Sequence, residues 1–150
     1  MTLDELISNY DNLLNGLDPI MLDEVTTIAQ DGLVFVDRRI TRTGTNSSGK
    51  TFPDYSPSYK LEKKRAGKYR GIVDLTFTGE MWRNIKIVGK FQSGTMTTVR
   101  VGASDAKTQA KMDNNADLRG DFMNLSEQEL ADLVKDSQER LFGTITGYLE

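Results

Sequence analysis

The first 42 residues carry apolar side chains at the spacing of an α-helix, and this pattern constrains the fold more than any other feature of the chain. Asp18 is a typical helix cap, and Pro19 suits the first helical position, where its missing N–H is not needed. We expect one long helix from Pro19 to about Arg42, with a bend near Gly32. Its apolar side chains are Leu22, Val25, Ile28, Ala29, Leu33, Val36 and Ile40.

A shorter helical pattern precedes this stripe. Thr2 and Glu5 have the spacing of a capping box. Gly16 is expected to end this first helix. The pattern therefore predicts an N-terminal helical arm over residues 1–17 and a single α+β domain over residues 18–150. The apolar residues of the arm are Leu3, Leu6, Ile7, Tyr10, Leu13 and Leu14.

The remainder of the chain alternates between short strand-like and helix-like stretches. Residues 43–58 are rich in Thr, Gly, Ser and Pro and predict a long loop. Ser126 and Glu129 predict a second capping box, which starts a helix that runs to about Phe142. The fold class expected is α+β: a long N-terminal helix packed on a small antiparallel sheet, with an extended loop and a C-terminal helix. Short helices are predicted at 59–66, 80–85 and 106–114, and strands at 72–78, 85–88 and 95–102.

The 150 residues include neither cysteine nor histidine. A catalytic triad, a histidine base, a thiolate nucleophile and a zinc knuckle are therefore all excluded. Carboxylate, lysine or tyrosine chemistry and hard-metal sites remain open on this ground; we expect no enzymatic activity, no cofactor and no bound metal. The N-terminus lacks the pattern of a signal peptide, and the apolar runs are too short to span a bilayer, so we expect a soluble protein made in a cytoplasm.

The net charge of -3 conceals a strong asymmetry along the chain. The stretch from Arg38 to Arg100 has 14 basic and 4 acidic residues, and the remainder has 5 basic and 18 acidic residues. Such an arrangement suits head-to-tail packing, in which an acidic face of one subunit meets a basic face of the next. The alternative is that the two kinds of charge intermix on the folded surface.

The segment from Gly44 to Thr51 matches the letters of a phosphate-binding P-loop, G-x-x-x-x-G-K-[ST]. That site needs a buried strand before the loop and a helix that begins at the Gly-Lys-Thr step. Charged residues precede the match, and Pro53 and Pro57 follow it. Because proline disfavours the required helix, we interpret the segment as the tip of a flexible hairpin, and a nucleotide hydrolase remains a minor alternative.

A basic cluster follows the loop, with three tyrosines interleaved: Tyr55, Tyr59 and Tyr69. Lysine and arginine can neutralise phosphates, and tyrosine can stack on bases. The cluster is a candidate DNA-facing surface, and its alternative is a solvated or inter-subunit face. Its members are Lys60, Lys63, Lys64, Arg65, Lys68 and Arg70.

Three segments in order resemble the tail-completion or virion-morphogenesis proteins of tailed phages, over about residues 32–142. The first combines Gly49, Phe52-Pro53, Tyr55-Ser56-Pro57 and Tyr59 with Lys63 or Lys64 and Gly67. The second is Asp74 to Met81, and the third is Arg119 to Ser126. The histidine often seen before the third segment is missing here, Asp121 and Met123 stand where relatives vary, and residues 2–15 have no counterpart.

The resemblance implies a non-enzymatic virion protein that forms a ring of 12 or 6 copies in the head–tail connector, made in the host cytoplasm and incorporated at the neck or tail. The implied partners are copies of itself, the portal or adaptor ring and tail proteins, with non-specific contact to packaged DNA and none to membranes. We expect the polar loop to place aromatic anchors against a neighbouring subunit. Trp82 is expected to be a core anchor, with an interface residue as the alternative, and Tyr148 a terminal docking residue, with a disordered terminus as the alternative. The interface candidates are Phe52, Tyr55, Tyr59, Trp82 and Tyr148. The main alternative is a nucleic-acid-binding accessory protein that uses residues 60–70.

Overall fold

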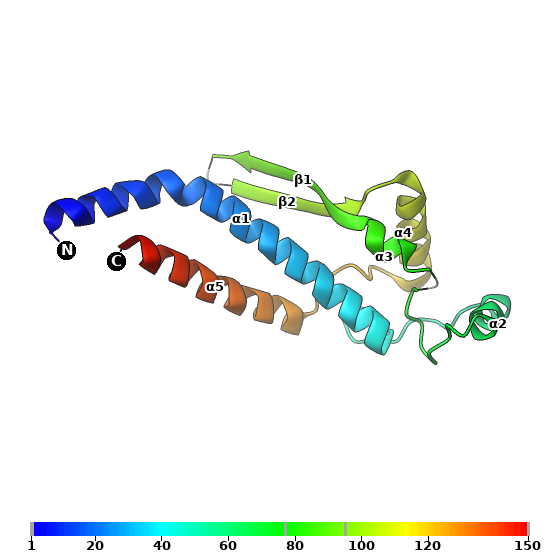
Figure 1. Cartoon of the computed structure of the whole chain (residues 1–150). Coiled ribbons are helices and arrows are strands. Elements are labelled where there is room, and N and C mark those ends of the chain that lie inside the picture. The colour runs from blue at the N-terminus through cyan, green and yellow to red at the C-terminus, as the bar shows by residue number, and fades with distance from the viewer. Residues whose placement is uncertain (1, 77, 95, 150) are drawn as a thin grey trace.

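The computed structural model describes residues 2–76, 78–94 and 96–149. One long helix forms the axis of the molecule, and the remaining elements pack along it or at its end (Figure 1). The elements are α1 (Leu3–Thr43), α2 (Pro57–Arg65), α3 (Glu80–Asn84), β1 (Ile85–Ser93), β2 (Met96–Ala103), α4 (Ala106–Arg119) and α5 (Glu127–Leu149).

Helix α1 is continuous for 41 residues, so the predicted break at Gly16 is wrong. The capping box of Thr2 and Glu5 starts it as expected, and Gly44 ends it in the left-handed conformation at φ 65°. Contacts with α5 explain why the helix continues. The Tyr148 hydroxyl lies over Gly16, only 3.2 Å from where a Cβ there would be, so the glycine permits close packing between helices rather than a helix end.

Pro19 lies inside α1 instead of at a helix start. A proline in a helix interior lacks one N–H and clashes with the carbonyl four residues earlier, which bends the helix. Figure 1 shows α1 changing direction in its N-terminal half, whereas its C-terminal half is drawn straight. The bend thus falls on the side of Pro19 rather than near Gly32, where the sequence pattern placed it.

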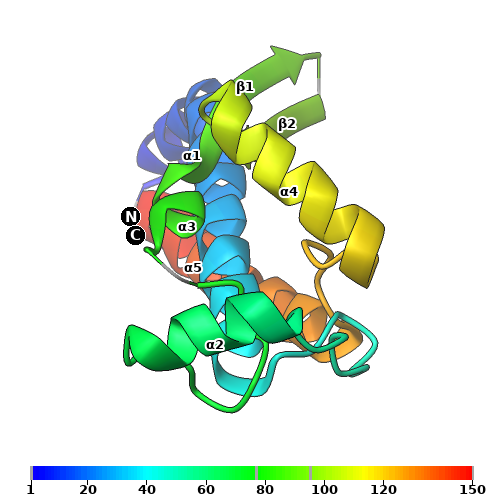
Figure 2. The ribbon, with the colours of Figure 1, turned by 90° about the vertical axis from the view of Figure 1, so that its right-hand side faces the viewer.

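Helix α5 and the β-hairpin lie on different sides of α1 (Figures 1 and 2). The α5 helix runs antiparallel to α1, so the two chain ends lie at the same end of the molecule. Arg140 joins the helices by ion pairs to Glu24 at 2.7 Å and Asp31 at 3.3 Å. The capping box of Ser126 and Glu129 starts α5 as predicted, although α5 continues to Leu149, beyond the expected end near Phe142.

The sheet in the described chain consists of the antiparallel pair β1–β2, with a bulge between Ile87 and Gly89. The third predicted strand, over 72–78, is wrong for the residues that the structure describes. Asp74 and the positive φ of 51° at Leu75 turn the chain sharply at this point. The alternation of Val73 and Leu75 instead places one residue in the core and one beside it. The α+β class is confirmed, with a smaller sheet than expected.

The core forms where α1, the loop after it and the sheet meet. The fully buried apolar residues of this cluster come from six separate segments, including the predicted loop. They are Val36, Ile40, Phe52, Tyr55, Val73, Met81, Ile85 and Phe122. All three segments that resemble phage proteins contribute to it. Helix α3 is fastened to α4 by Glu80, whose pKa is lowered to about 2 by hydrogen bonds from Lys111 and Lys107.

Replacing Pro19 by alanine should stabilise the protein. The change restores a helical N–H and removes the clash, so we expect the free energy of unfolding to rise by about 1–3 kcal/mol. Pro57→Ala is the matched control, because Pro57 stands at the start of α2 and its removal should change stability by less than about 0.5 kcal/mol. Urea denaturation followed by circular dichroism measures both. An unchanged or lowered stability for Pro19→Ala would contradict this assignment of strain.

Candidate functional site

The basic segment of residues 57–70 lies at the end of the molecule farthest from the chain termini (Figure 1). It contains one lysine that is not on the surface. The side chain of Lys63 is completely buried, and its Nζ lies 2.5 Å from Asp74 Oδ1. The same ammonium donates to the Thr76 carbonyl at 2.5 Å. The interpretation of Lys63 as a DNA-facing residue is therefore wrong, because its ammonium group is paired with Asp74 inside the protein.

Tyr55 completes this buried network. Its hydroxyl donates to Asp74 Oδ1 at 3.0 Å and accepts the Leu75 N–H at 3.0 Å. Lys63 Nζ also lies 4.7 Å from the centre of the Tyr55 ring. Burial and the Asp74 carboxylate both raise the pKa of the Tyr55 phenol, which is thus neutral at physiological pH. The network joins the loop, α2 and the turn at residues 74–76 into one unit.

The loop after α1 is not a free arm. Phe52 is 5% exposed and Tyr55 is 8% exposed, and both belong to the protein's own core. The expectation that they anchor a neighbouring subunit is corrected, because the loop packs apolar rings inward while its polar residues bond to each other. Tyr59 packs edge-on to Tyr55, with ring centres 5.0 Å apart, and remains partly exposed. Its role at an interface stays a prediction.

The other members of the basic cluster are more accessible. Lys60 forms an ion pair with Asp54 at 2.5 Å and lies 5.2 Å from the centre of the Tyr69 ring. Lys64 approaches the same ring at 5.4 Å. The side chains of Lys64, Arg65, Lys68 and Arg70 are exposed. A positively charged surface therefore exists at this end, although it is smaller than the sequence suggested.

Trp82 and Tyr148, the two remaining interface candidates, both contact the chain itself. Trp82 is partly buried against the core, and its indole N–H has no hydrogen-bond partner among the described residues. This position supports the interpretation as a core anchor. Tyr148 packs on Gly16 and keeps 37% of its surface exposed. Contact of either residue with another subunit stays a prediction.

The P-loop-like segment has a different geometry from a phosphate-binding loop. It follows a helix rather than a strand, and Thr45 pairs with Thr51 across a tight turn. The Asn46 side-chain oxygen accepts from the backbone N–H groups of Ser48 and Lys50. Since α2 begins only at Pro57, no helix starts at the Gly-Lys-Thr step of residues 49–51. The hairpin interpretation agrees with this geometry.

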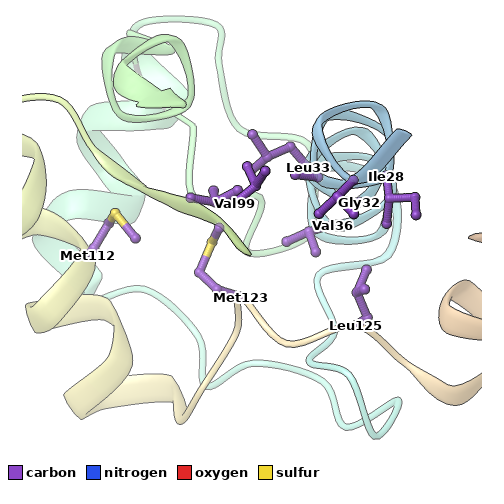
Figure 3. Close-up of a pocket in the computed structure, with 11 residues that line it drawn as sticks. Ile28, Gly32, Leu33, Val36, Val99, Met112, Met123 and Leu125 are labelled. Carbon is purple, nitrogen blue, oxygen red and sulfur yellow. The ribbon is translucent and has the colours of Figure 1, made fainter. Parts of the chain in front are cut away.

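An apolar groove lies between α1, β2, α4 and the segment before α5, and sequence reasoning did not find it (Figure 3). It has a volume of about 410 Å³, and every residue around it is apolar. Val99 and Met123 face Ile28, Leu33 and Val36 across it. Part of the groove was visible in the sequence as the wide apolar stripe of α1, which supplies Ile28 and Val36 to its lining.

Arg39 fixes the segment before α5, which forms one side of the groove. Arg39 forms an ion pair with Glu129 at 2.5 Å and donates to the carbonyls of Phe122 at 3.0 Å and Asn124 at 2.8 Å. The segment from Phe122 to Leu125 is thereby fixed beside α1, with Met123 and Leu125 turned to the groove. This arrangement can bind an apolar group, and it presents no nucleophile or acid–base pair.

Comparisons with protein-family models, with curated proteins and with solved structures gave no match. Among the residues that the structure describes, no group of three acidic side chains is placed to hold a metal ion. Across the same residues, none of the helices combines the length and apolar character needed to cross a membrane.

Replacing the buried Lys63 by alanine should lower the stability of the protein far more than replacing the exposed Lys64. Lys63→Ala leaves the Asp74 carboxylate buried and unpaired, and we expect it to lower the free energy of unfolding by about 3–5 kcal/mol. Lys64→Ala, one residue further along α2 and exposed, should change it by less than about 0.5 kcal/mol. Chemical denaturation of both variants makes the comparison. Similar values for the two would show that the ion pair does not hold the loop in place.

Proposed function

We propose that this protein is a structural subunit of the head–tail connector of a tailed bacteriophage, where it forms a homo-oligomeric ring of 12 or 6 copies between the portal or adaptor and the tail. In this role the protein is not an enzyme. It acts by presenting surfaces to copies of itself and to the rings on either side.

The observation that carries the proposal is the amount of apolar surface that the fold leaves without a partner. Large apolar side chains are between 36% and 73% exposed along α1 and α5, and the groove beside α1 is lined by apolar residues throughout. Soluble monomers seldom expose apolar patches larger than a few hundred Å², and larger ones mark association sites. The resemblance of residues 32–142 to phage morphogenesis proteins supports the same role.

Mass measurement of the purified protein, with and without the portal ring of the same particle, tests this proposal. We expect either a closed oligomer in solution or a monomer that becomes a ring only on the portal. Static light scattering and native mass spectrometry both report the copy number. A protein that stays monomeric across concentrations and ignores the portal would overturn the proposal.

The exposed basic residues at the end of α2 support a second candidate, a nucleic-acid-binding accessory protein. Phosphate contacts by lysine and arginine make affinity fall steeply with salt. If this surface binds DNA, the double variant Arg65→Ala/Arg70→Ala should flatten the plot of log affinity against log salt by about one unit for each lost contact. Lys135→Ala, exposed on the acidic α5 helix, is the control. Equal slopes for the wild type and both variants would exclude binding by this surface.

A further inference from the structure

The N-terminal half of α1 carries an apolar stripe that α5 does not cover. Its residues recur at alternating steps of three and four, the spacing of a helix that packs along its length against another surface. Leu17 and Met21 lie one position beyond Gly16 and Ile20, which face α5, and are therefore turned about 100° from that side. The stripe consists of Ile7, Tyr10, Leu14, Leu17 and Met21.

Helix α5 has a matching stripe. Leu133 packs against Gly32 of α1, and Arg140 bonds to Glu24, so these residues define the side of α5 that faces α1. Val134 and Leu141, each one position further on, are again turned about 100° away. Phe142, which follows Leu141 and is 73% exposed, lies at the outer edge of this stripe, about 180° round the helix from Leu133. The stripe consists of Leu130, Val134, Leu141, Phe142 and Ile145.

The two stripes lie on the same side of the helix pair. Successive residues of a right-handed helix turn clockwise when viewed from its N-terminus, and α1 and α5 run in opposite directions (Figure 1). A turn in the direction of the sequence therefore brings both stripes to the same face. At Val25 and Ile28 the α1 stripe continues into the apolar groove. We call this surface, made of the two stripes, the helix-pair face.

The helix-pair face is surrounded by negative charge. Residues 2–31 contain seven acidic and no basic residues, and α5 contains five acidic and two basic residues. Two such faces meeting each other would repel. A symmetric dimer through this face is thus electrostatically disfavoured, and a basic apolar surface is the better complement.

The hairpin provides such a surface. Residues 85–103 contain three basic and no acidic residues, and two of the three, Lys86 and Arg100, lie on the side of the hairpin that points away from the groove. Val99 and Val101 of β2 point to the groove, so the alternate residues point away from α1. Val88, Phe91 and Met96 are all exposed on that outer side. Arg100 stacks on the Phe91 ring at 5.5 Å. We call these residues, together with the exposed Lys86 and Thr98, the outer hairpin face.

We propose that the outer hairpin face of one copy docks on the helix-pair face of the next copy. The contact pairs apolar side chains at its centre and opposite charges at its rim, as specific interfaces do. Because the two faces differ, the association is head-to-tail and generates a ring when the rotation between copies closes. This inference rests on the proposed ring function and adds the surfaces by which the ring is built.

Single-cysteine variants test the contact directly, since the native chain has no cysteine. Gln138→Cys places a thiol among the α5 stripe, and Thr98→Cys places one on the outer hairpin face; both positions are exposed. When the two variants are mixed and treated with a bismaleimide cross-linker, we expect a cross-linked heterodimer. Ser58→Cys, exposed on α2, is the control partner and should give no product with either variant.

Other products identify which idea fails. Cross-linking of Gln138→Cys to itself would replace the head-to-tail contact with a symmetric one. Absence of the heterodimer while the native protein still forms rings would place the interface elsewhere and leave the ring function standing. A native protein that never associates, on the portal or alone, would overturn both proposals.

A substitution on the helix-pair face supplies an independent measurement. Phe142→Ser removes its most exposed apolar side chain and should weaken self-association by tenfold or more, as hot-spot residues do, with the melting temperature unchanged. Leu118→Ser is the matched control, because Leu118 is also more than half exposed but lies on α4. Equal association constants for Phe142→Ser and the wild type would overturn the proposed contact.

Discussion

The length of α1 is the constraint on which the rest of the structure depends. A helix of 41 residues is roughly 60 Å long at 1.5 Å per residue, whereas a domain of 150 residues has a radius of gyration of roughly 15 Å. The chain cannot cover such a rod on all sides. Helix α5 follows one side for much of its length, and the hairpin covers another at the C-terminal half. Apolar surface on the N-terminal half is left exposed as a consequence of this geometry. Because the chain itself cannot bury this surface, a second subunit is the partner that the proposed assembly supplies for it.

A second constraint holds the far end of α1 together. The loop of residues 44–56 has few apolar residues of its own, yet Phe52 and Tyr55 are buried. Phe52 packs in the core cluster, and Tyr55 is held there by the hydrogen bond of its hydroxyl to Asp74, which also pairs with Lys63. A buried ion pair contributes little net stability, but loss of one partner is costly, so the network fixes one arrangement of the loop rather than adding much to its strength.

The parts of the fold that local chemistry determines were predictable. Both capping boxes, at Thr2 and Ser126, occur where the spacing of serine or threonine and glutamate placed them, because each needs only four consecutive residues. The helix break at Gly16 failed because a contact 132 residues away in the chain, from Tyr148, decides the role of that glycine. The prediction of a strand at 72–78 was wrong for the same kind of reason. Asp74 forms an ion pair with Lys63, and the chain turns at Leu75 instead of continuing as a strand.

The candidate site also has parts that the sequence could predict and parts that depend on tertiary packing. Charge counting located the basic segment, but it could not separate the buried Lys63 from the exposed Lys64, since their positions on α2 differ only in the direction that tertiary packing selects. The sequence pattern predicted that Phe52 and Tyr55 anchor the loop against a neighbouring subunit, whereas they anchor it to the core of this chain. The groove could not be predicted because it is built from four segments, and the sequence pattern reveals only the part that the α1 stripe contributes.

Pro19 connects the energetics of α1 with its proposed role in assembly. It lies within the N-terminal stripe, between Leu17 and Met21, so the bend that it causes sets the direction in which the first part of α1 presents its apolar side chains relative to the groove. In a head-to-tail ring, the rotation between copies is fixed by the angle between the two docking surfaces within one subunit. The outer hairpin face is attached to the straight half of α1, and much of the helix-pair face to the bent half. A straight helix would be more stable, but it would present the two surfaces at a different angle and would change the closure of the ring.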